Sequence, residues 1–254
     1  MPAFAALIPA YNCADRAAAV VRGVKRYVQD VLVVDDGSSD GTGESVRAAG
    51  ARLVVHSLNC GKGPAVRSGL AVLLGQGYSH ILMLDADGQH DPEDAPRFLK
   101  AAAEADFVLG NRLWDREAIP AKRYWTNFIG TRALQLMTGF PLEDSQCGYR
   151  LVSSSYLRRM GLVGNRYSID TEIIVRAGKL RARFAHVPVR VIYEGAVSHY
   201  RPVPDTVHIV LSAARFKIDE GDLRSDPGPE AWSKLVNAPR VLEPTAACAL
   251  QEPV

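Results

Sequence analysis

The sequence predicts one α/β domain, with a mostly parallel sheet flanked by helices. Two observations lead to this class. Short apolar segments alternate with segments of helical periodicity through the first half of the chain, which is the pattern of successive βαβ units. The chain has 254 residues and is 47% hydrophobic, and a chain of this kind can bury a single large core.

The predicted strands are short apolar segments with turn residues between them. The first is expected to end at Pro9, because proline cannot donate to a β ladder. After residue 112 the alternation stops, and one later strand is predicted over residues 185–193. The five strands predicted before that point cover residues 4–8, 31–34, 52–55, 81–84 and 107–109.

The predicted helices follow from apolar stripes and from residues typical of helix ends. Asn12 is the predicted N-cap of the first helix. The second helix is expected to run from near Asp40 to a stop at Gly50, and the third to follow Gly63. Pro92 lies in the first turn of the fourth, beside acids that suit the positive end of the helix dipole. Later helices are predicted over residues 123–138, 171–180 and 205–218, with a polar loop over 142–150.

Composition restricts the partners and the compartment. A formal net charge of +2 lacks the basic excess typical of nucleic-acid binding, so no nucleic-acid partner is expected. Four scattered cysteines without a Cys-x-x-Cys pair argue against a zinc site or a disulfide framework and favour a reducing cytoplasm. No signal peptide is visible, and no segment approaches the roughly 20 apolar residues that span a bilayer. We therefore expect a cytoplasmic protein.

Asp85 and Asp87 directly follow the apolar segment 81–84. Two carboxylates one residue apart at the end of a buried strand suit Mg²⁺ or Mn²⁺. Such an ion is usually completed by substrate phosphates. A turn with Asx-type hydrogen bonds has the same residue types, so this motif alone does not identify a metal site.

A second acidic turn, Asp35-Asp36, follows the apolar segment 31–34. Ligands of open parallel sheets bind beyond the carboxyl ends of the strands, so both acidic strand ends are expected to face one crevice. Adjacent like charges repel unless they meet donors or a cation. This turn therefore strengthens the prediction of a site for a charged ligand.

Two weaker signals accompany the acidic turns. Tyr11 and Asn12 close the first strand, where they could stack on and hydrogen-bond to a nucleobase, although a plain strand-end turn is the simpler interpretation. Lys62 stands between glycines at a helix start, a position that suits an anion. The spacing of a P-loop is absent, and so is the dehydrogenase fingerprint Gly-x-Gly-x-x-Gly after the first strand.

Taken in order, these motifs resemble the family 2 glycosyltransferases, and within them the branch of dolichyl-phosphate mannose synthases and polyprenyl-phosphate hexosyltransferases. The resemblance rests on four motifs, Ile8-Pro9-Ala10-Tyr11-Asn12, residues 33–42, Asn59-Cys60-Gly61-Lys62-Gly63 and Asp85-Ala86-Asp87-Gly88-Gln89-His90. It implies a GT-A fold, a single Rossmann-like domain. We place this domain at residues 1–218, with a donor half 1–112, an acceptor half 113–218 and a loosely ordered tail over 219–254.

The resemblance also implies roles for individual residues. The nucleotide-sugar donor would be bound by Pro9, Tyr11, Asn12, Asp35, Asp36, Lys62 and Asp85. The metal, Mn²⁺ or Mg²⁺, would be held by Asp85, Asp87 and Gln89. Catalytic roles would fall to Asp87, to Arg112 of the element Gly110-Asn111-Arg112, and to Gln146 and Arg150 of the loop 145–150.

The activity implied is inverting transfer of a hexose from a GDP-mannose or UDP-glucose type of donor to a polyprenyl- or dolichyl-type lipid phosphate. A phosphate oxygen is already anionic and needs positioning by arginines, whereas a sugar hydroxyl needs a carboxylate base, for which Asp144 and Glu143 are the candidates. The alternatives are a glycosyltransferase with a sugar hydroxyl acceptor in polysaccharide or glycolipid synthesis, and a non-catalytic nucleotide-sugar-binding module. A sugar-phosphate nucleotidyltransferase is disfavoured, because residues 9–12 replace its glycine-rich loop.

A basic stretch over residues 176–190 contains no acidic residue. A solvated face is the ordinary explanation for such a run. Together with the apolar stripe of residues 207–218 it could also meet an anionic membrane surface. Peripheral contact with the inner face of the membrane is therefore included among the expected interactions.

Overall fold

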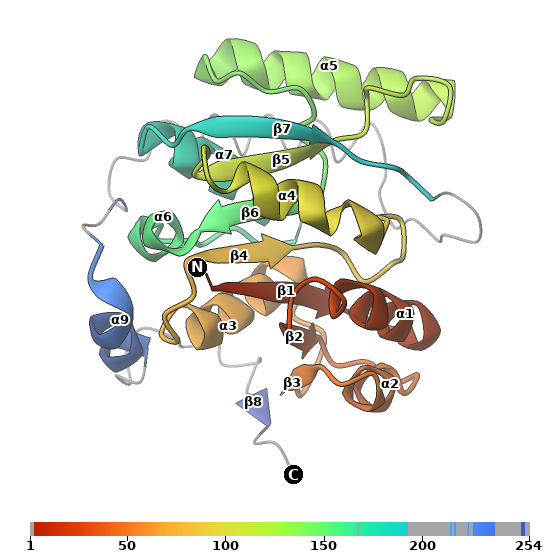
Figure 1. Ribbon diagram of the computed structural model, residues 1–254, viewed down its shortest axis with the longest axis vertical. Coiled ribbons are helices and arrows are strands. Elements are labelled where there is room, and N and C mark those ends of the chain that lie inside the picture. The colour runs from red at the N-terminus through yellow and green to blue at the C-terminus, as the bar shows by residue number, and fades with distance from the viewer. Residues whose placement is uncertain are drawn as a thin grey trace.

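The computed structural model describes residues 3–166, 168–192, 214, 216, 223, 226–236 and 250–251. Within them, one sheet has the strand order β7-β5-β6-β4-β1-β2-β3-β8 (Figure 1). The strands are β1 (Phe4–Ala10), β2 (Asp30–Asp35), β3 (Arg52–His56), β4 (His80–Met83), β5 (Phe107–Asn111), β6 (Arg150–Ser153), β7 (Phe184–Pro188) and β8 (Leu250–Gln251).

Helices lie against this sheet, with α5 beyond β7 at one end and α2 near β3 at the other (Figure 1). The helices are α1 (Ala14–Val24), α2 (Thr42–Ala48), α3 (Lys62–Leu73), the 3₁₀ turn η1 (Pro92–Asp94), α4 (Ala95–Ala101), α5 (Ala121–Thr138), α6 (Ser154–Arg159), α7 (Ser168–Lys179) and α9 (Gly228–Val236).

Strand β1 is central and parallel to both β2 and β4. Because side chains alternate along a strand, Ala5 and Leu7 belong to one apolar core, shared with α3 and α7. Ala6 and Ile8 belong to a second core on the other face, shared with α1 and α4. The sheet is therefore covered on both faces, as expected of a mostly parallel sheet, and the predicted fold class is confirmed.

Strand β1 does not end at Pro9 as expected, because Pro9 pairs in register with Val34 of β2. The carbonyl of Ala10 faces β2, where it accepts from the backbone N–H of Asp36. Backbone groups alternate in direction along a strand, so the missing N–H of Pro9 faces the β4 side. Pairing with β4 already stops at Met83, and the proline therefore costs no ladder hydrogen bond there.

Asn12 is not the N-cap of α1, which begins after Cys13. Its backbone is left-handed, with φ of 47°. The helix start is satisfied instead by the next loop, because Ala14 N–H donates to Asp40 and Cys13 N–H to Thr42. The N-terminus of α1 is therefore capped by Asp40 and Thr42, which are distant in the sequence, and not by Asn12.

The elements β6 and α6 lie in segments for which no strand or helix was predicted. The polar loop expected over 142–150 ends where β6 begins, at Arg150. Strand β6 runs antiparallel between β4 and β5, which separates these two parallel strands. The strand expected over 185–193 is β7, Phe184–Pro188.

Part of the segment expected to be loosely ordered forms α9 and β8. Trp232 of α9 packs against the core beside α3. Asp226, just before α9, accepts from Arg158 at 2.6 and 2.9 Å. Strand β8 pairs antiparallel with β3. The helical stripe expected over 205–218 lies outside the described residues except for positions 214 and 216.

Within the described residues, no helix combines the length and the hydrophobicity that a bilayer span requires. In the basic stretch 176–190, Arg181, Arg183 and Arg190 are exposed, as expected of a solvated face. Arg176 departs from this expectation, because it is fully buried beside Glu172. Cys13 and Cys147 are free.

Candidate active site

A cleft of about 650 Å³ opens at the carboxyl ends of β1, β2 and β4 and continues toward α5 and α7. The sequence-predicted site residues that line it are Pro9, Tyr11, Asn12, Asp36, Lys62, Asp85, Asp87, Gln89, Arg112 and Gln146. Asp35 and Arg150 are absent from its described lining. The topology therefore gathers residues from 9 to 146 around one space, as the strand-end argument predicted.

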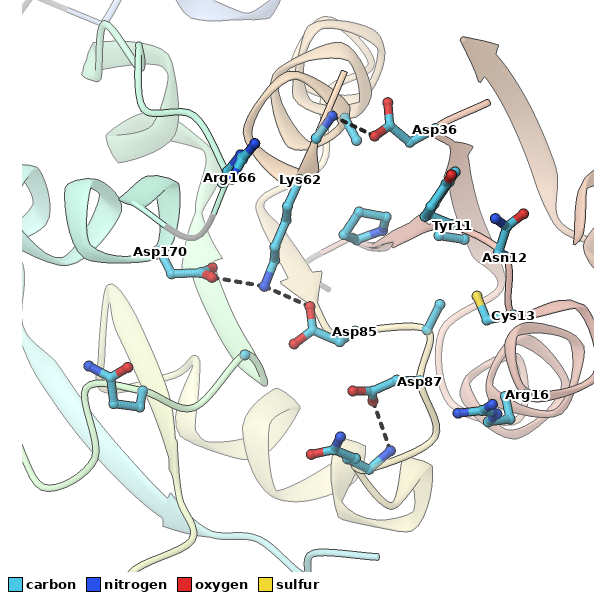
Figure 2. Close-up of a pocket in the computed structure, with 18 of the residues that line it drawn as sticks. Tyr11, Asn12, Cys13, Arg16, Asp36, Lys62, Asp85, Asp87, Arg166 and Asp170 are labelled. Atoms are coloured by element: carbon cyan, nitrogen blue, oxygen red, sulfur yellow. Dashed lines mark hydrogen bonds and ion pairs between the residues drawn. The ribbon is translucent and has the colours of Figure 1, made fainter. Parts of the chain in front are cut away.

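Lys62, at the start of α3, bridges two carboxylates across the cleft (Figure 2). Its Nζ lies 2.7 Å from Asp85 Oδ1 and 2.8 Å from Asp170 Oδ2. Burial opposes the charge on Lys62, but Asp170 and Asp85 outweigh it and raise its pKa. Burial likewise disfavours the Asp85 carboxylate, yet Lys62 and His90 lower its pKa to about 2. Lys62 and Asp85 are therefore a charged pair.

Arg150 lies behind the cleft wall rather than in it. Its side chain is 1% exposed and donates to the carbonyls of Asp170 and Cys147. A second contact joins Arg150 Nη2 to Asp170 Oδ1 at 3.1 Å. The direct substrate contact expected of Arg150 does not fit this position. It orients Asp170, and through Asp170 it supports Lys62.

Asp87 is the second carboxylate of the Asp85-x-Asp87 motif. In the described contacts, Lys62 binds Asp85 and not Asp87. Asp87 accepts from the backbone N–H of Gln89 at 2.9 Å, and Arg16 of α1 lies beside it (Figure 2). Burial, and then the charge of Asp85, raise the pKa of Asp87. A half-buried carboxylate whose charge is disfavoured by a neighbouring carboxylate fits a divalent cation. Asp85, Asp87 and Gln89 are the residues that would hold it.

Asp36 is buried, and its carboxylate is surrounded by donors. Oδ1 lies 2.7 Å from His56 Nδ1 and accepts from Cys60 N–H, and Oδ2 accepts from Gly61 N–H at 2.6 Å. His56, Asp36 and Cys60 thus form a compact group. We assign no metal to it, because His56 is hydrogen-bonded through both ring nitrogens, the second to Ser68.

Asp35 supports the turn after β2, as expected, by accepting from Ser38 N–H at 3.0 Å. The turn is pressed against the loop after β3 at Gly37, where φ is 73°. A Cβ added to Gly37 would lie 2.5 Å from the carbonyl carbon of Leu58. The two acidic neighbours therefore meet backbone donors, which explains how adjacent like charges are tolerated there.

Arg112 is held by Asp144 through a two-point ion pair, with Nε at 2.7 Å and Nη2 at 2.9 Å. Asp144 is fully buried and also accepts from the backbone N–H groups of Arg112 and Gln146. Burial disfavours its charge, but Arg112 more than compensates and lowers the pKa of Asp144. The other candidate base, Glu143, accepts from Asn111 at 2.7 Å.

Several polar residues of the cleft were not predicted from the sequence. Arg123 and Asn127 both line it from α5, and their i, i+4 spacing on one helix face is a signal that could have found them. Arg166 gave no such signal. It lies in a loop with left-handed φ of 48°, next to the start of α3. The cleft lining also includes Arg16, Cys13 and Thr171.

The fold and the site define a class of protein. A sheet with paired carboxylates and several cationic side chains at its carboxyl end is suited to a phosphorylated ligand and a divalent ion. The model of the family described as Glycosyl transferase family 2 matches residues 5–161. The chain belongs to this family.

Curated relatives and solved structures agree with this assignment. The chain is 32% identical to undecaprenyl-phosphate mannosyltransferase of Micrococcus luteus, over 72% of this chain and 81% of the relative. It is 27% identical to UDP-N-acetylglucosamine–dolichyl-phosphate N-acetylglucosaminyltransferase of Methanococcus voltae, over 74% and 84%. Glucosyl-3-phosphoglycerate synthase of Mycobacterium tuberculosis, solved with Mn²⁺, UDP-glucose and phosphoglyceric acid, superposes with a TM-score of 0.66. That comparison has 19% identity, covers 87% of this chain and 82% of the other, and shows the shared GT-A fold.

Proposed function

We propose that the protein is an inverting glycosyltransferase that moves a hexose from a nucleotide-diphosphate sugar to a polyprenyl- or dolichyl-type lipid phosphate. The observation that carries this proposal is the pairing of charges in the cleft. The acceptor side presents cations, whereas its carboxylates Asp144 and Asp170 are bound to Arg112, Lys62 and Arg150. Such a site suits an acceptor that arrives already ionised.

The donor would occupy the side of the cleft formed by β1, β2 and β4. Tyr11 and Asp36 would bind the nucleoside, and Lys62 and Arg16, which line the same cleft, would lie near the pyrophosphate. A bound Mn²⁺ or Mg²⁺, held by Asp85, Asp87 and Gln89, would stabilise the negative charge of the departing nucleoside diphosphate. Lys62 adds a fixed positive charge beside that group.

The acceptor would approach from the side of α5 and α7. Arg112 and Arg123, which line the cleft, would bind its phosphate, since arginine forms two-point hydrogen bonds with phosphate oxygens. An anionic phosphate oxygen attacks the anomeric carbon from the face opposite the leaving group and inverts it. A hydroxyl acceptor would instead require a base, and Asp144 accepts hydrogen bonds from Arg112 and Gln146 in place of a substrate proton.

The relatives support the acceptor class more than the sugar. The two relatives described above share a lipid phosphate in their names, undecaprenyl in one and dolichyl in the other. They differ in the sugar, which is mannose in one and N-acetylglucosamine in the other. We therefore propose the lipid phosphate and leave the sugar open. The intact Asp85, Asp87 and Arg112 favour an enzyme over a non-catalytic binding module.

Helix α5 supports peripheral contact with a membrane. Trp125, Ile129 and Leu136 expose 47%, 60% and 87% of their surface. Arg116 stacks on Trp125, and Arg132 on Phe128. Apolar side chains interleaved with arginines suit the boundary between acyl chains and anionic headgroups. Arg123 and Asn127 line the cleft from the opposite face of the same helix, so α5 would lie between that surface and the cleft.

A donor screen tests the proposal. The full chain with Mn²⁺ is offered GDP-mannose, UDP-glucose and UDP-N-acetylglucosamine, with a short polyprenyl phosphate, with the matching polyprenol or with neither, and nucleoside diphosphate release is measured. We expect release from one donor that depends on the phosphate-bearing lipid. Equal release with polyprenol would contradict the phosphate acceptor, and binding without release from any donor would favour the non-catalytic module.

A further inference from the structure

Three side chains form a hydrogen-bonded chain that runs inward from the cleft. Asp36 lines the cleft. Behind it lies His56, the last residue of β3, with Nδ1 2.7 Å from Asp36 Oδ1. His56 is 1% exposed, and its Nε2 lies 2.9 Å from Ser68 Oγ on α3. Of the three side chains, Asp36 is the one found in the described cleft lining.

Asp, His and Ser in this order also form the nucleophile arrangement of hydrolases. That arrangement requires the serine to meet the substrate. Here Ser68 stands at the inner end, and the described cleft lining includes neither Ser68 nor His56. Of these three side chains, Asp36 is therefore the one that would meet a ligand. The arrangement does not support hydrolysis by Ser68.

The acceptor positions of Asp36 are nearly filled. An ionised carboxylate offers about four lone-pair sites. Oδ1 takes His56 and the N–H of Cys60, and Oδ2 takes the N–H of Gly61. One site remains on Oδ2 for a donor in the cleft. By binding Oδ1, His56 leaves Oδ2 of Asp36 to accept from a ligand and fixes the orientation of the carboxylate plane.

The same contacts hold the loop that leads to Lys62. Cys60 and Gly61 immediately precede Lys62, and both donate to Asp36. The neighbouring Leu58 packs on the turn at Gly37, with no room for a Cβ. A change in the orientation of Asp36 would therefore also move Lys62. Asp36 is expected to meet the nucleoside of the donor, and Lys62 its pyrophosphate.

We infer that His56, oriented by Ser68, is a positioning residue of the nucleotide site, which holds Asp36 so that its remaining acceptor position meets a ring N–H of the nucleobase. This inference rests on the proposed function, because it assumes that Asp36 faces a nucleoside diphosphate. Uracil and guanine carry a ring N–H of this kind at neutral pH, whereas cytosine and adenine do not. His56 would thus contribute to the choice of base without touching it.

The test measures binding of nucleoside diphosphates with Mn²⁺ by calorimetry, without acceptor or turnover. Losing one hydrogen bond to a charged group corresponds to about tenfold or more in an equilibrium constant. We expect His56→Leu to weaken UDP or GDP binding by about tenfold and to reduce the preference over CDP. His56→Asn, whose amide can still donate to Asp36, should restore most of the affinity. Ser68→Ala should have a smaller effect in the same direction.

His80→Leu is the matched control, because His80 is a half-buried histidine on β4 whose ring bonds Ser79. It should leave nucleotide affinity unchanged, and melting curves of all variants establish that they fold. Wild-type affinity and base preference in folded His56→Leu would overturn the inference while the donor site stands. If the wild-type chain binds none of the nucleotides, the proposed function itself fails, which is a separate outcome. Equal losses in His56→Asn and His56→Leu would also overturn the inference, since they would indicate a general packing role.

Discussion

Arg112 and Asp144 form a buried two-point ion pair in which the aspartate has no exposed surface and the arginine lines the cleft. Asp144 directs the guanidinium by accepting from Nε, Nη2 and the backbone N–H of the same residue. The arginine that would meet phosphate is thus held in place before any ligand binds. Such preorganisation lowers the entropic cost of positioning a substrate.

Asp144→Asn should lose stability in a pH-dependent way. Arg112 lowers the pKa of Asp144 in the folded chain, so the stabilisation is fully present above the unfolded pKa, near 3.8. It is lost as the pH falls through the lower folded value. Breaking a buried pair costs about 3 kcal/mol, so we expect that deficit at pH 7 and a smaller one near pH 3. Urea unfolding at several pH values measures it, and a deficit that is constant with pH would contradict the pairing.

Asp87→Ala should abolish turnover with little loss of folding. The carboxylate has one described backbone hydrogen bond, and its raised pKa shows that its charge is not stabilised by the fold alone. We expect kcat to fall by at least about 10²-fold, with a melting temperature equal to or above that of the wild type. Chelation of divalent ions should reduce wild-type activity to a similar level. A fully active variant would refute the metal assignment.

Gly148→Ala should disturb Asp85 directly. A Cβ at Gly148 would lie 2.2 Å from Asp85 Oδ2, so the carboxylate or the loop must move. A displacement of about 1 Å in a catalytic site can cost roughly 10²-fold, and we expect a loss of that order in kcat/KM. Gly77→Ala is the control, because its φ of 80° gives backbone strain in open space. It should lose stability and keep its activity.

The exposed face of α5 should govern binding to vesicles. Each large apolar side chain that becomes buried contributes about 1.5–3 kcal/mol, so Trp125→Ser with Leu136→Ser should weaken binding to anionic vesicles by at least about tenfold. Leu58 is an exposed apolar residue in the loop after β3, a strand that lies far from β7 in the sheet order. Leu58→Ser should therefore bind as the wild type does. Co-sedimentation with the vesicles measures both, and equal binding by all three proteins would argue against this face.

Much of the cleft side formed by β1, β2 and β4 could be predicted because the sequence signal for it is local. The strand ends that carry Asp36 and Asp85 follow apolar segments directly, and a parallel sheet brings such ends together. What the strand ends contact could not be derived. The contacts of Asp36 with His56, and the place of Arg150 behind the wall, depend on residues that are distant in the sequence. Local patterns also misplaced the cap at Asn12, since its donors find acceptors in the next loop.

The place of β6 affects the division into a donor half and an acceptor half. Residues 107–111 form β5 in the first half, yet β6 from the second half stands between β4 and β5 and pairs with both. The sheet therefore needs strands from both halves, because β5 of residues 1–112 is joined to β4 through β6 of residues 113–218. We expect fragments cut at residue 112 to misfold when expressed separately and to recover a shared structure only when they are mixed.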